Sequence, residues 1–335
     1  MKKILITPRA FAKSGREVIR ELEKKGYSVI FNDTGKSYSP EVFLNLAKDA
    51  DGIIIGVDKA DRKVLESCTH LKAISKYGVG VDNIDMEAAK ELGISISRAL
   101  GANSQSVAEH TMALLLDLAK NVTRSTVSVR SGNWDKVYST ELYGKIIGII
   151  GFGNIGKRVA RMAQGFGMQV YAYDVFPIDP VYAEENKIHI AELEELLTSS
   201  DVVTVHLPLT DETENLINAE TMDLMKDSAY LINAARGGIV NEQDLYQTLK
   251  NGKLAGAGFD VFSTEPPCDE EPLLSLDNFL LTPHTASKTK EADDNTIRIS
   301  VENLLKDLQK KGEDWYEESF ERMPGERRVN SWNEN

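Results

Sequence analysis

Residues 151–156 read Gly-Phe-Gly-Asn-Ile-Gly, and this stretch decides the fold of the 335-residue chain. It directly follows the apolar run Ile146 to Ile150 and directly precedes a helical stretch, Lys157 to Phe166. In a strand-turn-helix unit the first glycine permits a tight turn, the second lets the backbone approach a pyrophosphate, and the third lets helix and strand pack closely. The N-terminus of the helix then binds the anion. We therefore predict a dinucleotide site built on Gly151, Gly153 and Gly156.

An acidic residue closes the next predicted strand, Gln169 to Tyr173. Asp174 follows Gly156 by 18 positions (174 − 156 = 18). Its carboxylate can accept hydrogen bonds from both ribose hydroxyls and repels a 2′-phosphate. No arginine follows closely to reverse this preference, so NAD is the expected cofactor of a Rossmann domain. A glycine turn with an unrelated surface aspartate is the structural alternative.

Short apolar runs alternate with amphipathic stretches along most of the chain, a pattern typical of parallel strands joined by helical crossovers. Five runs precede a long helix predicted over Asn103 to Lys120, and six follow it. The sequence thus favours two α/β domains, each with a doubly wound parallel sheet. The predicted strands are Lys3 to Thr7, Ser28 to Phe31, Gly52 to Ile55, Lys72 to Ser75, Ile94 to Ser97, Lys145 to Ile150, Gln169 to Tyr173, Asp201 to Leu207, Ala229 to Ile232, Gly256 to Phe259 and Phe279 to Leu281.

Two helix starts can be read from local sequence. Ser14 with Glu17 three residues later predicts a capping box, and Ser39 before Pro40 predicts an N-cap with proline in the first turn. The last amphipathic stretch, Ile297 to Lys310, has no strand after it and needs a sheet to pack on.

Composition narrows the class of protein. With 41% hydrophobic and 27% charged residues the chain is typical of globular proteins, and its length favours two domains over one. A net charge of -13 repels phosphate backbones and anionic membranes, so neither nucleic acid nor a membrane is an expected partner. Residues 1–9 lack the apolar run of a signal peptide. Cys68 and Cys268 lie at no metal-ligand spacing, which predicts free thiols, a cytoplasmic protein and no metal site.

Three residues that follow predicted strands could supply the chemistry of hydride transfer to a 2-keto acid. Arg236 could hold the substrate carboxylate through two parallel hydrogen bonds. His284 could donate a proton to the carbonyl oxygen if a carboxylate such as Glu265 were paired with it. A surface ion pair for the arginine and a structural role for the histidine are the alternatives, and sequence spacing does not prove that Glu265 and His284 touch.

The whole set of motifs resembles the D-2-hydroxyacid dehydrogenases, and most closely their phosphoglycerate dehydrogenase branch. The resemblance covers about residues 50–310 and includes segments 76–85, 103–110, 205–210, 233–240 and 260–267. It implies that Arg236 binds the substrate carboxylate, that His284 is the acid/base and that Glu265 supports it. It also implies a substrate loop of Lys76, Tyr77, Gly78, Val79 and Gly80, and a cofactor site of Gly151, Gly153, Asn154, Ile155, Gly156, Asp174, His206, Leu207, Pro208, Ala234, Ala235 and Asp260.

The resemblance also implies a domain plan and an oligomer. A Rossmann NAD domain, residues 102–285, is expected to be inserted into a flavodoxin-like substrate domain of residues 1–101 plus 286–312, with a tail over 313–335. The chain is expected to form a homodimer in which Gln105 to Glu141 packs between nucleotide domains. Trp134 and Tyr138 would then be buried anchors.

Departures from the family pattern leave the substrate open. Lys76 stands where phosphoglycerate dehydrogenases usually carry an arginine, and Gly56 and Val57 stand where they place a phosphate-binding arginine; Lys136 is a further candidate cation. A hydroxypyruvate or glyoxylate reductase and a D-lactate-type dehydrogenase are therefore alternatives to a 3-phosphoglycerate enzyme. Formate dehydrogenase is disfavoured because it carries glutamine at the position of Glu265. An NADH-sensing binding protein is a rival of another class, disfavoured by the absence of a long Pro/Ser-rich extension.

Overall fold

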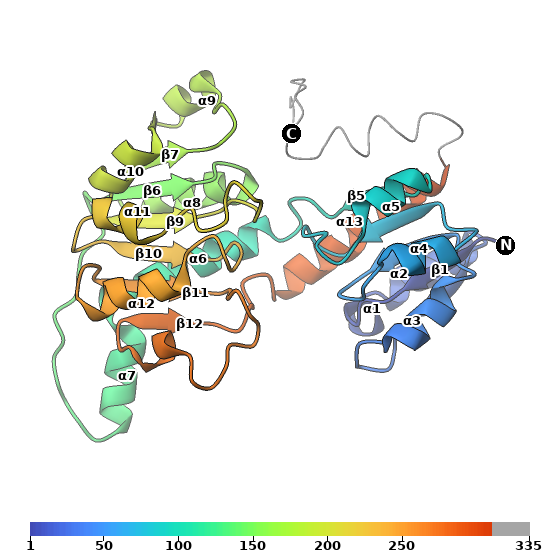
Figure 1. Cartoon of the computed structure of the whole chain (residues 1–335), viewed down its shortest axis with the longest axis horizontal. Coiled ribbons are helices and arrows are strands. Elements are labelled where there is room, and N and C mark those ends of the chain that lie inside the picture. Colours follow the sequence, from blue (N-terminus) through green and yellow to red (C-terminus); the bar gives the residue numbers. More distant parts are fainter. Residues whose placement is uncertain (310–335) are drawn as a thin grey trace. The chain divides into compact units, whose positions relative to one another are not determined.

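The computed structural model describes residues 1–309, which divide into two compact units (Figure 1). Unit 1 consists of residues 1–103 and 290–309, and unit 2 consists of residues 104–289. The chain thus leaves unit 1, completes unit 2 and returns. These boundaries lie near the expected ones at 101/102 and 285/286, whereas the tail expected over 313–335 lies outside the described residues.

The sheet of unit 1 contains five strands in the order β2-β1-β3-β4-β5, the flavodoxin-like order. All of its pairings in the described chain are parallel, with Ile4 opposite Val29 on one side and Gly52 on the other. The predicted strands agree with the observed ones to within a residue. The observed bounds are β1 Lys3–Ile6, β2 Ser28–Phe31, β3 Gly52–Ile55, β4 Ala73–Lys76 and β5 Ser95–Arg98.

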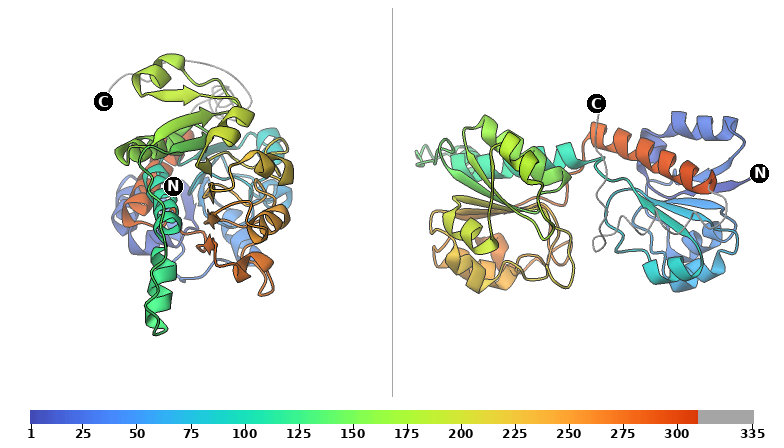
Figure 2. Two further views of the ribbon diagram at one scale, coloured as in Figure 1. Left: turned by 90° about the vertical axis from the view of Figure 1, so that its left-hand side faces the viewer. Right: turned by 90° about the horizontal axis from the view of Figure 1, so that it is seen from above.

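Helices cover both faces of this sheet (Figure 2). One apolar layer joins α1, α2 and α13 to the strands through residues such as Phe11, Leu22 and Val301. The other joins α3, α4 and α5 through Phe43 and Leu65. The last helix therefore packs on the first sheet. The helices are α1 Ala10–Lys13, α2 Arg16–Lys24, α3 Pro40–Ala47, α4 Arg62–Ser67, α5 Met86–Glu91 and α13 Lys290–Gln309.

One of the two predicted helix starts is confirmed and the other is wrong. The Ser39 hydroxyl accepts a hydrogen bond from the Val42 N–H, and Pro40 opens α3. Ser14 instead ends α1: its N–H bonds the Ala10 carbonyl, and its backbone is helical (φ −109°, ψ −15°). A capping serine needs an extended backbone, and only Ser14 and Gly15 separate the two helices, so Ser14 ends α1 and Gly15 takes the N-cap position of α2.

The sheet of unit 2 contains seven strands in the order β12-β11-β10-β9-β6-β7-β8, which is the Rossmann order extended by one strand. The order reverses where β6 and β9 lie side by side, and ligands bind at such a point beyond the carboxyl ends of the strands. Sequence reasoning missed β8, which has three residues and buries only Ile188. The bounds are β6 Ile146–Ile150, β7 Gln169–Tyr173, β8 Ile188–Ile190, β9 Val202–Val205, β10 Tyr230–Asn233, β11 Gly256–Phe259 and β12 Phe279–Leu281.

Two apolar layers also sandwich this second sheet. The helices α6, α8 and α9 pack on one face, and α10, α11, α12 and the short helix η1 pack on the other. Helix α7 differs, because none of its side chains is buried and it projects from the body of unit 2 (Figure 1). The bounds are α6 Ser104–Lys120, α7 Val122–Arg130, α8 Asn154–Gly165, α9 Pro180–Glu185, α10 Leu193–Ser199, α11 Ala219–Leu224, α12 Glu242–Lys250 and η1 Pro272–Ser275.

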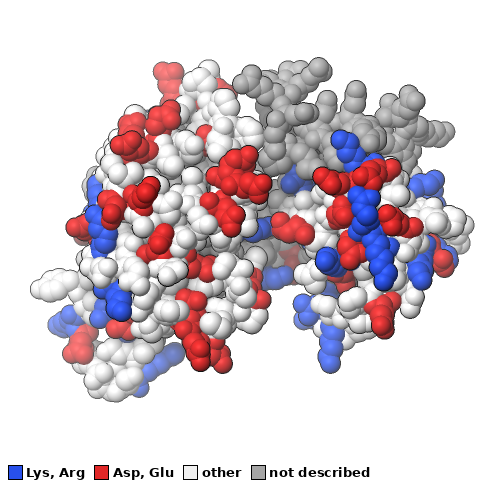
Figure 3. Space-filling view, viewed as in Figure 1, with Lys and Arg blue, Asp and Glu red and all other residues white. Residues whose placement is uncertain are grey.

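The surface carries charges of both signs. On the face drawn in Figure 3, acidic side chains outnumber basic ones over unit 2, whereas the two kinds are interspersed over unit 1. Within residues 1–309, no helix combines the length and the apolarity that crossing a bilayer requires.

Candidate active site

The glycine turn after β6 leaves an open approach to the start of α8. Gly151 has φ +97°, and a Cβ on it would lie 2.7 Å from the carbonyl carbon of His206. A Cβ on Gly156 would lie 2.3 Å from the Gly151 oxygen, whereas one on Gly153 would meet nothing within 4 Å. Gly153 is the N-cap of α8 and offers no side chain to the first N–H groups of that helix. These donors suit a pyrophosphate, as the sequence predicts.

Asp174 lies over the same turn. Its Oδ2 accepts a hydrogen bond from the Phe152 N–H at 2.6 Å, and its Oδ1 accepts one from the Phe176 N–H at 3.0 Å. These bonds orient the carboxylate at the end of β7. Each oxygen can accept a second hydrogen bond, so the group fits the two hydroxyls of an adenosine ribose.

His206 follows β9 at the point where the strand order reverses. Its ring Nε2 lies 3.0 Å from Thr204 Oγ1, and its backbone N–H donates a hydrogen bond to the Ile150 carbonyl at 2.7 Å. Burial lowers the pKa of its imidazole to about 3, so the ring is neutral. Its Nδ1 is buried and has no partner in the described part of the chain.

The loop after β10 carries Arg236. Asn233 shapes this loop, because its side chain accepts from the Ala235 N–H at 3.1 Å and donates to the Arg236 carbonyl at 2.9 Å. The next residue packs tightly, since a Cβ on Gly237 would lie 2.1 Å from the Phe262 carbonyl carbon. The half-buried Arg236 guanidinium donates to the Ala235 carbonyl at 2.8 Å, which leaves other N–H groups for a ligand.

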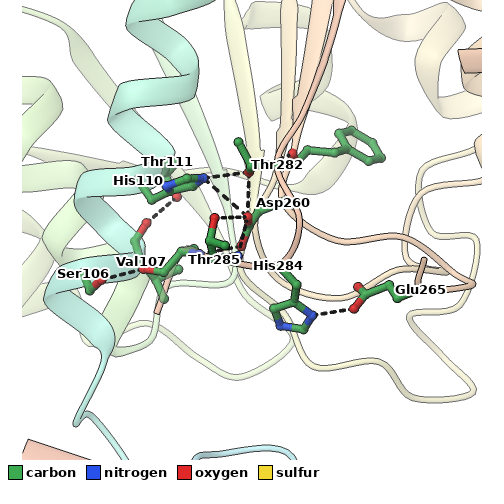
Figure 4. A network of polar contacts seen from close by, with 11 residues as sticks. Ser106, Val107, His110, Thr111, Asp260, Glu265, Thr282, His284 and Thr285 are labelled. Atoms are coloured by element: carbon green, nitrogen blue, oxygen red, sulfur yellow. Dashed lines mark hydrogen bonds and ion pairs between the residues drawn. The ribbon is translucent and has the colours of Figure 1, made fainter. Parts of the chain in front are cut away.

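Glu265 and His284 meet beyond the carboxyl ends of β11 and β12. His284 Nδ1 lies 2.7 Å from Glu265 Oε2 (Figure 4). The other carboxylate oxygen accepts a hydrogen bond from the Phe262 N–H at 3.0 Å. Both side chains are partly exposed, at 47% and 38%. Because Nδ1 faces a carboxylate, it carries a proton, and Nε2 is the atom left to exchange one with a substrate.

Strands β10, β11 and β12 are neighbours, so the three predicted chemical residues follow adjacent strands of one sheet. The close approach of Gly237 to Phe262 links the loop of Arg236 to that of Glu265. The structure thus brings Glu265 into direct contact with His284 and places the Arg236 loop beside them.

The predicted substrate loop begins at the end of β4 in unit 1. Lys76 is buried, and its ammonium donates to the Gly56 carbonyl and to Asn83 Oδ1, each at 2.6 Å. Tyr77 donates to Asp293 Oδ1 at 2.9 Å, and burial and that carboxylate raise the pKa of its phenol. Gly78 has φ +127°, which favours glycine. Lys76 therefore helps to hold its own loop in place.

Sequence reasoning missed the hydrogen-bonding role of Asp260, a residue predicted to line the cofactor. Its buried carboxylate accepts hydrogen bonds from the Thr282 hydroxyl and the Thr285 N–H, on either side of His284, and it also lies 3.5 Å from His110 Nε2. The resemblance points to the segments of Asp260 and His110, yet no spacing rule indicates that they meet.

The fold, the glycine turn and the histidine-carboxylate pair define the chain as an oxidoreductase with an NAD-binding domain. Residues 112–286 match the family model of the D-isomer specific 2-hydroxyacid dehydrogenase, NAD binding domain. The chain belongs to this family, whose members are NAD-dependent dehydrogenases.

Relatives with assigned activities differ in substrate. The chain is 41% identical over 312 residues to a D-3-phosphoglycerate dehydrogenase of Methanocaldococcus jannaschii, and the match covers 92% of this chain but 58% of that longer protein. It is 38% identical to a hydroxypyruvate reductase of Thermotoga maritima, with 86% of this chain and 96% of that protein covered. The structure is similar to that of a D-lactate dehydrogenase from Escherichia coli, with a TM-score of 0.77, 30% identity, and 91% and 96% of the two chains covered.

Proposed function

We propose that the chain catalyses reversible hydride transfer between NADH and the α-carbon of a small 2-keto or 2-hydroxy acid. The single observation that carries this proposal is the 2.7 Å contact between His284 Nδ1 and Glu265 Oε2. These two residues follow β12 and β11, and β11 lies next to β10, the strand that precedes Arg236. NAD would supply the hydride acceptor or donor. The residues that would hold it are Gly151, Gly153, Asn154, Ile155, Gly156, Asp174, His206, Leu207, Pro208, Ala234, Ala235 and Asp260.

The chain's own groups would then have three tasks. In reduction His284 would give its Nε2 proton to the carbonyl oxygen of the substrate, and in oxidation it would take that proton back. Glu265 would hold the imidazole ring through Nδ1 and so fix the direction in which Nε2 faces. Arg236 would bind the substrate carboxylate and so orient the α-carbon. The substrate loop of Lys76, Tyr77, Gly78, Val79 and Gly80 belongs to the proposal as a set of further substrate contacts.

The identity of the acid is a matter for a substrate panel. We propose 3-phosphohydroxypyruvate, hydroxypyruvate, glyoxylate and pyruvate as the first candidates, because similar proteins act on several of these or are named for their reduced products. The engagement of Lys76 with Gly56 and Asn83 favours the substrates that lack a phosphate over the phosphorylated one.

The decisive experiment follows NADH consumption by the purified full chain with each acid. The proposal expects saturable, substrate-dependent oxidation with at least one acid, and a loss of it in His284→Ala. A matched control is His189→Ala. His189 is an exposed histidine of β8, the opposite edge strand of the same sheet, and its ring pairs with Glu195. NADH binding without turnover on any acid would contradict the proposal and favour an NADH-sensing role.

A homodimer and a cytoplasmic location are part of the same proposal. Trp134 and Tyr138 are 79% and 101% exposed in the single chain, and α7 buries no side chain on its own unit. A second copy packed on this segment would cover both aromatic rings. Cys68 and Cys268 are both free, which suits a reducing compartment. No nucleic-acid partner is proposed, given the net charge of -13.

A further inference from the structure

We propose that His110 is a positioning residue for His284 and acts through Thr282 and Asp260. The inference rests on the proposed function, in which His284 exchanges the proton. The three side chains come from separate elements of unit 2: His110 from α6, Asp260 directly after β11 and Thr282 directly after β12. Figure 4 shows them joined in one network beside His284.

Asp260 holds the segment on both sides of His284. Its carboxylate is 1% exposed, and Oδ1 accepts from the Thr282 hydroxyl at 2.6 Å and from the Thr285 N–H at 2.8 Å. Oδ2 accepts from the Ala286 N–H at 2.8 Å. Between these anchors His284 has φ +52°, a left-handed conformation that residues other than glycine seldom adopt. The Asp260 bonds therefore stabilise the unusual backbone that presents the imidazole.

The hydrogen bonds around Thr282 show which ring nitrogen of His110 carries a proton. Its Nε2 lies 2.9 Å from Thr282 Oγ1 and 3.5 Å from Asp260 Oδ1. A hydroxyl has one proton, and the 2.6 Å contact directs that proton to the carboxylate of Asp260. If His110 Nε2 were unprotonated, two lone pairs would face each other across 2.9 Å. His110 therefore carries a proton on Nε2 and donates it to Thr282.

Helix α6 holds the His284 segment at two points one turn apart. His110 donates a hydrogen bond to Thr282 at the start of the segment, and the Ser106 hydroxyl donates one to the Ala286 carbonyl at 2.5 Å at the end of the segment. The helix is itself anchored by buried residues such as Met112 and Leu115. Without the His110 donor, the Thr282 hydroxyl would lose one of its two short partners and the segment would be less restrained. Proton transfer depends steeply on such positions.

The first test compares two substitutions of the same residue. His110→Phe removes the donor but retains a ring, whereas His110→Gln retains an N–H donor near the position of Nε2. We expect kcat to fall about tenfold in His110→Phe, with KM and the Kd for NADH nearly unchanged, and to recover in His110→Gln. The control is His189→Phe, which removes a histidine contact from the far edge of the sheet. Equal kcat in His110→Phe and the control, or equal losses in His110→Phe and His110→Gln, would overturn the proposal.

A second test asks whether His110 acts through Thr282. Thr282→Val should lower kcat as His110→Phe does, whereas Thr282→Ser should retain activity. The double variant His110→Phe/Thr282→Val should have a kcat little lower than that of either single variant. Fully additive losses would contradict a shared route. Nitrogen-15 NMR of the histidine-labelled wild-type chain gives a readout without activity: an Nε2-protonated His110 is expected, and an Nδ1-only tautomer would refute the assignment. A wild-type chain inactive on every acid would instead defeat the proposed function.

Discussion

Gly151 and His206 touch backbone to backbone, so that a Cβ on the glycine would lie 2.7 Å from the carbonyl carbon of the histidine. The contact joins the turn after β6 to the end of β9, the two strands at which the sheet order reverses. The glycine turn and the neighbouring strand therefore have to fold as one unit for the cofactor site to exist.

Gly151→Ala should damage both stability and cofactor binding. The added methyl meets backbone atoms, and the backbone at φ +97° disfavours any side chain, so we expect a loss of about 2 kcal/mol of unfolding free energy and much weaker NADH binding. Urea unfolding and NADH fluorescence titration would measure the two effects. Gly165→Ala is the control, because a Cβ there meets nothing within 4 Å and alanine favours the helix. Normal NADH binding by Gly151→Ala would contradict the assignment.

His284→Ala should separate chemistry from binding. The side chain would be the proton donor but does not belong to the glycine turn, so kcat should fall by about 10²-fold to 10⁴-fold while the Kd for NADH changes little. Steady-state kinetics and a binding titration would check this expectation. Turnover that survives the change would remove His284 from the mechanism.

Asp174→Ser should relax the selection against NADP. The serine no longer repels a 2′-phosphate, so the ratio of kcat/KM for NADPH to that for NADH should rise. The measurement is kinetics with both cofactors on one acid. Asp211→Ser, which removes an exposed carboxylate from the same unit, should leave the ratio unchanged. A ratio in Asp174→Ser equal to that of the wild type would argue against contact with the ribose.

Asp201→Asn should make the free energy of unfolding less dependent on pH in the acid range. Burial opposes ionisation of Asp201, but bonds from the Ile146 N–H at 2.9 Å and from Lys226 at 3.1 Å prevail, and the pKa of the carboxyl is lowered. Its contribution is thus fully present above the unfolded pKa of about 3.9 and is lost as the pH falls through the folded pKa.

At neutral pH we expect Asp201→Asn to cost about 1.5 kcal/mol, and the difference from the wild type to shrink in acid. Denaturant unfolding across pH would measure it. Asp227→Asn is the control, since Asp227 pairs with Lys253 on the surface, where such a pair contributes little. A difference for Asp201→Asn that is constant at every pH would refute the charge argument.

Trp134→Glu combined with Tyr138→Glu should weaken the proposed homodimer. Both rings are exposed in the single chain, and two carboxylates in an apolar interface would be strongly unfavourable. Sedimentation velocity of the variant should show monomer at concentrations where the wild type is a dimer. Val57→Glu, at an exposed apolar residue of unit 1, is the control. A wild-type chain that sediments as a monomer would contradict the dimer.

Regular patterns in the sequence were sufficient for most of the fold. Ten of the eleven predicted strands have four or five residues, and several of them, such as β3 and β9, are buried along their whole length. The three-residue β12 is also predicted, because Phe279 and Leu281 stand between turn residues. The exposed edge strand β8 has no such signal. Helix α13 begins at Lys290, seven residues before the Ile297 that the sequence predicts, because its first turns carry few apolar residues from which a helical period could be recognised.

The sequence by itself determined the glycine turn, Asp174 and the identity of the residues that follow each strand, because these depend on neighbours within about twenty positions. Only the tertiary structure decided which of those residues meet. His110 and Thr282 are 172 positions apart, and Asp260 reaches three groups at 282–286, because a parallel sheet gathers the carboxyl ends of strands that are distant in the chain. Hydrogen bonds of this kind depend on distances of a few tenths of an ångström, which residue spacing does not encode.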